Sequence, residues 1–381
     1  MAIADKTPKP RARDLGIPFD GTPGSFNAIT DVAGVEVGFT TLVSGGPEAA
    51  QALPQVRTGV SAILPRGRAG TAPVYAAFFS QNGNGEVTGM HWVKESGFLE
   101  GPVMITNTHS VGVVRDAVIA WQVKNALVPL TSSAASGWWS NPVVAETYDG
   151  PPLNDINGFH VRPEHVFAAI DTAASGAVAE GNVGGGTGMS CYQFKGGTGT
   201  ASRRVSTPAD TYTIGVLAQC NCGLRQQLIV RGVPVGVEIP LPAPPQADAA
   251  AAPVEVGSII IVIATDAPLL PGQLERLARR ATMGLARTGS SSGNYSGDIF
   301  IAFSTANAGA TQKPLATVSV FSNDLISPLF EATAQATEEA ILNALVAAET
   351  MTGANGARVE ALPHEQFRNA MRKYNRLPDR G

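Results

Sequence analysis

Charged side chains are scarce in this chain of 381 residues. Asp, Glu, Lys and Arg make up 15% of it, against about 25% in average soluble domains. The net charge is only −4, and no basic run or aromatic–basic patch indicates a nucleic-acid-binding surface. Few charges and 42 glycines together predict a large buried interior, or surface hidden in an oligomer, with many tight backbone turns. We expect no nucleic-acid partner.

Long apolar runs are missing as well. No stretch approaches the ~18 residues that a membrane-spanning helix needs. Residues 1–13 carry basic side chains but no apolar signal-peptide core. The sequence therefore predicts a soluble, cytoplasmic protein with no membrane partner.

Cysteine and histidine are too few and too scattered to predict a metal site. Cys191, Cys220 and Cys222 lack further ligands at zinc-site spacing, and the five histidines form no H-E-x-x-H motif or i,i+4 helical pair. The densest glycine stretch, residues 180–189, has neither the ending of a P-loop nor the spacing of a dinucleotide-binding loop. We interpret its glycines as permitting close backbone approach at the wall of a pocket, and we expect no metal and no cofactor.

Short apolar strands and longer amphipathic helices are spread along the chain. Strands are expected at 60–65, 103–106, 143–148, 212–221, 258–264 and 299–303, and helices near 113–121, 165–174, 271–287, 330–348 and 364–373. This mixture predicts layered α/β packing in one domain, 1–381. The Pro- and Ala-rich segment 240–253 is interpreted as a surface loop or linker rather than a domain boundary.

A serine-rich joint separates the expected helix 271–287 from the expected strand 299–303. The order helix, serine, strand is the reverse of the α/β-hydrolase elbow, so the match of Gly289-x-Ser291-x-Gly293 to that motif is rejected. Taken by itself the joint is most simply a Gly/Ser loop. The alternative is a serine that becomes a nucleophile once the chain breaks before it, because the new α-amine can then serve as its base.

Two further polar sites follow apolar strands. Glu146 and Tyr148 would point to the same face of a strand, because side chains repeat every two residues. Without other information, Glu146 is best interpreted as a solvated acid near a strand end. Asn221 ends the expected strand 212–221, where its amide could donate to an oxyanion or simply occupy a turn.

The chain resembles the DmpA/BapA family of N-terminal-nucleophile hydrolases, which comprises L-aminopeptidase/D-amidase/D-esterases and β-aminopeptidases. The resemblance covers nearly the full length, and its matching segments in chain order are 11–19, 27–35, 180–189, 263–269 and 349–355. It implies an αββα sandwich that cuts itself between Gly289 and Ser290. The products would be an α chain, 1–289, and a β chain, 290–381, assembling as a homo-oligomer, a tetramer of αβ units.

The resemblance also implies a role for each candidate residue. Ser290 corresponds to the nucleophile, Asn221 to the asparagine that stabilises the oxyanion, and Glu146 to the acid that binds the substrate's free ammonium group. Tyr148 matches a tyrosine of the L-aminopeptidase/D-amidase member, where the β-aminopeptidase member has an apolar residue. Ser296, Asp298 and Glu349 could orient the nucleophile or its amine, but the sequence does not place them.

The expected function is thus an aminopeptidase or amidase acting on short peptides, amides or esters with a free amine. The L-aminopeptidase/D-amidase/D-esterase type is favoured because of Tyr148. The alternatives are a β-aminopeptidase, a family member that cuts itself but has no peptidase activity, and a non-catalytic glycine-rich binding protein.

Overall fold

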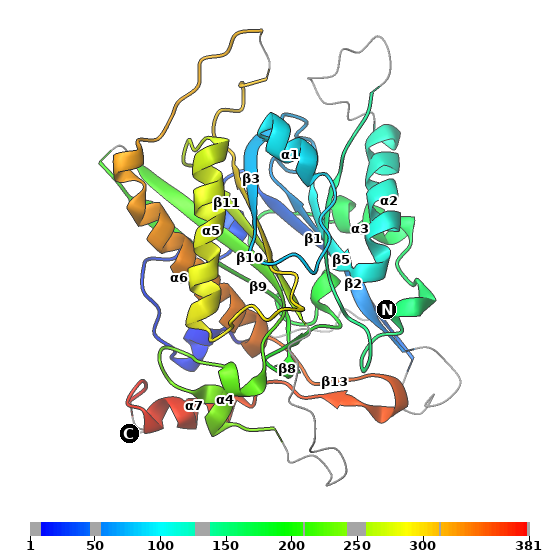
Figure 1. Ribbon diagram of the computed structural model, residues 1–381, viewed down its shortest axis with the longest axis vertical. Helices are drawn as coiled ribbons and strands as arrows, with labels where there is room; N and C mark the ends of the chain where they lie inside the picture. The colour runs from blue at the N-terminus through cyan, green and yellow to red at the C-terminus, as the bar shows by residue number, and fades with distance from the viewer. Residues whose placement is uncertain are drawn as a thin grey trace.

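Two β-sheets lie face to face between two layers of helices (Figure 1). The computed structural model describes residues 9–45, 55–125, 138–208, 210–241, 257–311 and 314–378. The smaller sheet has the order β1-β2-β5-β6, with β1 (Glu36–Ser44), β2 (Val56–Leu64), β5 (Val103–Asn107) and β6 (Val143–Thr147). The larger sheet has the order β4-β3-β12-β11-β10-β9, with β4 (Phe98–Leu99), β3 (Val74–Ser80), β12 (Ile299–Ser304), β11 (Ser258–Thr265), β10 (Thr211–Asn221) and β9 (Gly197–Ser206).

The helices and the short hairpins complete these layers. The described helices are α1 (Met90–Ser96), α2 (Val111–Lys124), α3 (Pro163–Asp171), α4 (Val235–Glu238), α5 (Pro271–Arg287), α6 (Ser327–Val346) and α7 (His364–Lys373). Two small hairpins pair β7 (Ser190–Cys191) with β8 (Phe194–Lys195), and β13 (Met351–Thr352) with β14 (Arg358–Val359). None of the helices in the described ranges is both long enough and apolar enough to cross a bilayer.

Each pair of neighbouring layers encloses its own cluster of buried apolar side chains. Successive side chains of a strand point to opposite faces of its sheet, so one strand contributes to two clusters. In β11, Ile259 and Ile261 pack toward the cluster that includes α5 and α6, whereas Ile260 and Val262 pack between the sheets. Alternate residues of β2 likewise pack against α2 and α3, as Val60 does. Strands covered on both faces need apolar residues at nearly every position. The predicted αββα sandwich is confirmed.

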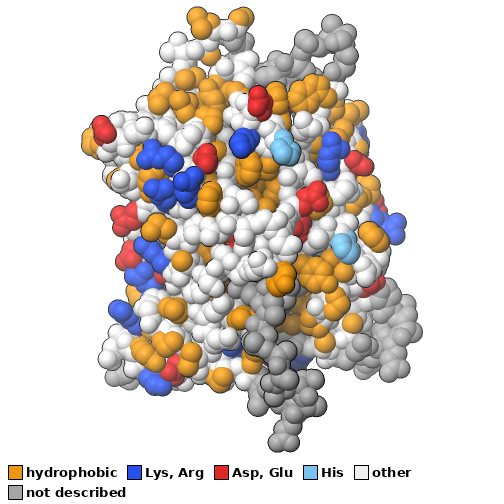
Figure 2. All heavy atoms as spheres, viewed as in Figure 1, with side chains coloured by type: hydrophobic (Ala, Val, Ile, Leu, Met, Phe, Trp, Pro, Cys, Tyr) orange, Lys and Arg blue, Asp and Glu red, His pale blue; other side chains and the backbone are white. Residues whose placement is uncertain are grey.

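The expected elements are found close to their predicted bounds. Helices α5 and α7 begin and end where the apolar spacing places them, at 271–287 and 364–373. Only residues 240–241 of the expected linker 240–253 lie within the described part of the chain. On the face in Figure 2, Lys and Arg side chains gather over α5 and α6, while uncharged and apolar atoms cover much of the rest.

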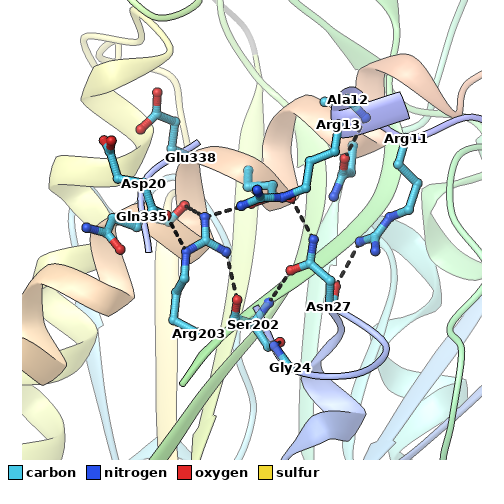
Figure 3. Close-up of polar contacts among 12 residues, drawn as sticks. Arg11, Ala12, Arg13, Asp20, Gly24, Asn27, Ser202, Arg203, Gln335 and Glu338 are labelled. Carbon is cyan, nitrogen blue, oxygen red and sulfur yellow. Dashed lines mark hydrogen bonds and ion pairs between the residues drawn. The ribbon is translucent and has the colours of Figure 1, made fainter. Parts of the chain in front are cut away.

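The N-terminal segment is held by a buried ion-pair network on β9 and α6 (Figure 3). Arg13 and Arg203 both pair with Glu339, at 2.7 and 2.6 Å. The Asn27 amide donates to the same carboxylate at 2.6 Å. Because opposite charges surround Glu339, its burial is tolerated. These polar contacts act together with the burial of Ala12 and Ile17 in the apolar core to fix the segment.

The connections bring the ends of three strands to one place. β11 and β12 run parallel and are joined through α5, so the serine-rich joint leads into the starting edge of β12, next to the start of β11. β10 runs antiparallel to β11, which pairs its last residue, Asn221, with Ser258. The Gly297 amide donates to the Ser258 hydroxyl at 3.1 Å, which ties the joint to this edge.

Candidate active site

The joint begins with a backbone conformation that requires glycine. Helix α5 ends at Arg287, and Gly289 has φ +100°, in the left-handed region. A Cβ at residue 289 would lie 1.8 Å from the carbonyl oxygen of Gln227, so no side chain fits there. The neighbouring Thr288 accepts a hydrogen bond from the Ile229 amide at 3.0 Å. The Gly289–Ser290 peptide bond is therefore held in one conformation by its surroundings.

Ser290 follows the turn at residues 288–289 and is 8% exposed. Its Oγ accepts a hydrogen bond from the Ser292 amide at 3.1 Å. Ser292 has φ +51°, which a residue with a side chain seldom adopts. Strained backbone of this kind persists only where the neighbouring structure enforces it.

Two asparagines, Asn82 and Asn84, provide that enforcement. The Asn82 amide donates to the carbonyls of Ser292 and Gly293 at 3.1 and 2.9 Å, and its oxygen accepts from the Asp298 amide at 2.8 Å. The Asn84 amide donates to the Tyr295 carbonyl at 2.7 Å. The turn 82–85 thus fixes the loop that follows Ser290. The repeat Asn82-Gly83-Asn84-Gly85 is typical of a turn, but it does not indicate the loop that its side chains contact.

A cleft of about 510 Å³ opens beside this loop. Three of the predicted site residues line it: Glu146, Tyr148 and Asn221. Tyr295 from the loop and Ser258 from the start of β11 line it as well. Ser290 is not among the described residues that line the cleft; it lies in the loop that supplies Tyr295. The structure thus brings three candidates together and places the fourth in an adjoining segment of the intact chain.

Glu146 is a buried acid at the carboxyl end of β6, only 3% exposed. The interpretation as a solvated acid is wrong, because β6 is covered by β5 and by residues 86–88. Its carboxylate accepts hydrogen bonds from the Glu86 amide at 3.0 Å and from the Thr108 hydroxyl. Thr108 follows the neighbouring parallel strand β5, so both side chains emerge at the same sheet edge. Burial raises the pKa of Glu146, although these hydrogen bonds oppose the rise.

Asn221 is the last residue of β10, and its amide is oriented at both ends. Its Oδ1 accepts from the Ser190 amide at 2.9 Å, and its Nδ2 donates to the Tyr148 carbonyl at 2.8 Å. An amide nitrogen carries two protons, so a second one is available for a bound substrate. Tyr148 is 46% exposed and lines the same cleft as Glu146, as the alternation along the strand predicts.

The three residues that the sequence did not place differ in their surroundings. Ser296 and Asp298 are fully buried in the segment between Ser290 and β12. Asp298 accepts a hydrogen bond from the Ile259 amide at 3.2 Å. Glu349 is exposed and pairs with Lys9 at 2.8 Å. Ser296 and Asp298, which lie in the segment that follows Ser290, are therefore better placed than Glu349 to orient the nucleophile or its amine.

Uncharged polar and apolar side chains line this cleft, together with one carboxylate, that of Glu146. Across the described ranges, no group of three or more His, Cys, Asp or Glu side chains is arranged to hold a metal ion. The arrangement can instead bind an ammonium group at a buried carboxylate and offer an amide proton to an oxyanion.

Comparison with known proteins agrees with this chemistry. Residues 27–359 match the model of peptidase family S58. The chain is 55% identical to the β-peptidyl aminopeptidase BapA of Sphingosinicella microcystinivorans, with 99% of this chain and 96% of that protein aligned. It is 48% identical to the β-peptidyl aminopeptidase BapA of Sphingosinicella xenopeptidilytica, over 95% of this chain and 91% of the relative.

Solved structures give the same assignment. The L-aminopeptidase D-Ala-esterase/amidase of Ochrobactrum anthropi, described as a variant of the Ntn hydrolase fold, superposes with a TM-score of 0.88 at 47% identity, covering 97% of this chain and 100% of that one. A β-aminopeptidase of Burkholderia sp. superposes with a TM-score of 0.83 at 47% identity, covering 98% of this chain and 100% of that one. The chain therefore belongs to peptidase family S58 and is a serine aminopeptidase with the Ntn hydrolase fold.

Proposed function

We propose that the chain cuts itself between Gly289 and Ser290 and that Ser290, as the new N-terminus of the β chain, is the nucleophile. The position at the cut site that only glycine fits, and the clamped loop after it, support this proposal. In the precursor, the Ser290 hydroxyl attacks the Gly289 carbonyl carbon and the peptide C–N bond breaks, giving an ester. Water then hydrolyses the ester, which leaves a carboxylate on Gly289 and a free amine on Ser290.

Turnover follows the same chemistry on a substrate. The Ser290 α-amine, with an ordinary pKa near 8, accepts the hydroxyl proton as Oγ attacks the scissile carbonyl. The second N–H of the Asn221 side-chain amide, which does not bond the Tyr148 carbonyl, donates a hydrogen bond to the oxyanion. The leaving amine takes the proton, and water resolves the acyl-enzyme. Glu146 binds the substrate's ammonium group, which limits the reaction to the first residue of a peptide. The tetramer of αβ units stays a prediction.

We assign the removal of N-terminal β-amino acids from short peptides and amides as the preferred reaction. The observation that carries it is the 55% identity to a β-peptidyl aminopeptidase over almost the whole of both chains. L-Aminopeptidase/D-amidase/D-esterase activity is the second candidate, because Tyr148 lines the cleft and the Ochrobactrum anthropi enzyme is 47% identical.

A panel of free-amine p-nitroanilides separates these two reactions. Processed protein is assayed with β-, L-α- and D-α-amino-acid derivatives that carry the same side chain. We expect the β-amino-acid derivative to give the highest kcat/KM. A higher kcat/KM for the L-α derivative would reverse the assignment, and no turnover of any derivative by fully processed protein would leave a self-cutting protein without peptidase activity.

Replacing Glu146 by Gln is expected to weaken binding of substrates with a free amine. Gln keeps the shape and can accept from the Glu86 amide through its carbonyl oxygen, while its NH2 group donates to the Thr108 hydroxyl. It loses the charge, worth about 1.5–3 kcal/mol in a hydrogen bond to an ion. We therefore expect kcat/KM to fall roughly 10- to 100-fold, mainly through KM. For the same reason, KM of the wild type rises as the pH falls through the raised pKa of Glu146 and the carboxylate becomes neutral.

The matched control is Glu86→Gln, which removes an exposed neighbouring carboxylate and is expected to change KM by no more than about twofold. N-acetylated substrates provide the second control. An equal loss on free and acetylated substrates would show that Glu146 has only a structural role.

A further inference from the structure

Lys195 is a buried cation that the proposed mechanism does not use. It lies on β8 and is 0% exposed. Its ammonium group donates to the carbonyl oxygens of Met189 and Gly196, both at 2.8 Å, and to that of Gly186 at 3.5 Å. Burying a cation costs several kcal/mol, and a methionine would fill similar space without that cost. The charge therefore calls for a reason beyond packing.

The partners of Lys195 lead directly to the cleft. Met189 and Ser190 share one peptide group: its carbonyl accepts from Lys195 at 2.8 Å, and its N–H donates to Asn221 Oδ1 at 2.9 Å. Ser190 is also the register partner of Lys195 in the β7–β8 hairpin. A single peptide unit thus links the ammonium group to the amide of Asn221, a residue that lines the cleft.

Hydrogen bonds in such a chain polarise one another. A cation on the Met189 carbonyl makes the Ser190 N–H a stronger donor, and a stronger donor to Oδ1 makes the Asn221 Nδ2 protons more positive. We infer that Lys195 is a positioning residue for the reaction: through the 189–190 peptide it orients and polarises the Asn221 amide toward the oxyanion. This inference rests on the proposed role of Asn221.

The surroundings leave the lysine only partly charged at neutral pH. Burial, together with the charge of Lys9, lowers the pKa of Lys195 to about 7, while Cys191 and Asp149 oppose the shift. Asp149 is itself buried, and burial raises its pKa to about 6. Assays at pH 6.5 keep most of the lysine protonated.

The test is a double-mutant cycle on processed protein with a p-nitroanilide of a β-amino acid. We compare four proteins at pH 6.5: wild type, Lys195→Met, Asn221→Ala and the double variant. Intact mass gives the concentration of processed chain that begins at Ser290, and kcat is calculated from that concentration. We expect Lys195→Met to lower kcat about tenfold with KM changed less than about twofold, because a charge-assisted hydrogen bond is roughly twice as strong as a neutral one. In the Asn221→Ala background the same substitution should change kcat less than about twofold.

Other results would overturn the inference. A tenfold loss that persists in the Asn221→Ala background means that Lys195 acts without Asn221, and an unchanged kcat in Lys195→Met means that the charge does nothing. If Asn221→Ala alone keeps the wild-type kcat, Asn221 is not the oxyanion donor, and the role of Lys195 falls with it. That result is distinct from one in which Asn221→Ala lowers kcat but Lys195→Met does not, which refutes only the role of Lys195. Lys94→Met, at an exposed position of α1, is the matched control. Should Lys195→Met lack a cooperative thermal transition, Lys195→Gln replaces it, because its amide can donate but has no charge.

Discussion

Ser290→Ala is expected to give one uncut chain of 381 residues with no measurable aminopeptidase activity. The substitution removes the hydroxyl that attacks the Gly289 carbonyl, so the α-amine that would act as base is never released. Loss of a nucleophile costs about 10⁴- to 10⁶-fold in related serine chemistry. Because Ser290 Oγ makes one described hydrogen bond, to the Ser292 amide, we expect little loss of folding stability. A denaturing gel, intact mass and p-nitroanilide hydrolysis measure the outcome.

The adjacent serine offers a matched control. Ser291→Ala removes an exposed hydroxyl whose described contact is a 3.4 Å hydrogen bond from Gln227. This variant should be cut to give a β chain beginning at Ser290 and should keep its activity within about twofold. Normal turnover by the uncut Ser290→Ala variant would refute the assignment of Ser290 as the nucleophile. A β chain that begins at residue 291 would instead assign that role to Ser291.

Asn221→Ala is expected to lower kcat by about 10²–10³ with a much smaller change in KM, the effect of removing one oxyanion donor. The amide contacts the negative oxygen only as the tetrahedral intermediate forms, so its loss affects the transition state more than substrate binding. The substitution also removes the hydrogen bonds to the Ser190 amide and the Tyr148 carbonyl, each worth about 1 kcal/mol. A thermal melt of each variant measures that structural part separately.

Asn221→Asp distinguishes loss of the oxyanion donor from loss of the hydrogen bond that Asn221 accepts from the Ser190 amide. Aspartate keeps an acceptor for the Ser190 amide but places a second oxygen toward the Tyr148 carbonyl and the oxyanion. It should therefore be at least as impaired in kcat as Asn221→Ala. An aspartate variant more active than the alanine variant would show that the acceptor function of residue 221 matters and that its N–H does not.

Elements with strong periodicity were predictable because their signal is local. Apolar residues three and four apart place α5 at 271–287, and continuous apolar runs place β11 and β12 near their observed bounds. The reversed order of helix and strand around the joint was sufficient to reject the hydrolase elbow. The resemblance added the layered fold, which the comparisons confirm.

The polar contacts at the site were not predictable in this way. Glu146 has the sequence context of a strand-end acid, and its burial depends on the separate segment 86–88 and on β5. Asn82 and Asn84 clamp a loop 210 residues or more further along the chain. Turn propensity reports the conformation of a residue, but it carries no information on the partner of its side chain.

By itself, the sequence determined the joint: a helix, a glycine, three serines and a strand. Those features depend on local conformation and on short-range apolar spacing, which a single chain encodes directly. Only the tertiary structure decided what surrounds the joint, namely the clamp from residues 82–85, the buried carboxylate of Glu146 and the peptide that links Lys195 to Asn221. Each of these joins strand ends or turns distant in the sequence, and the packing of two sheets brings them to one edge.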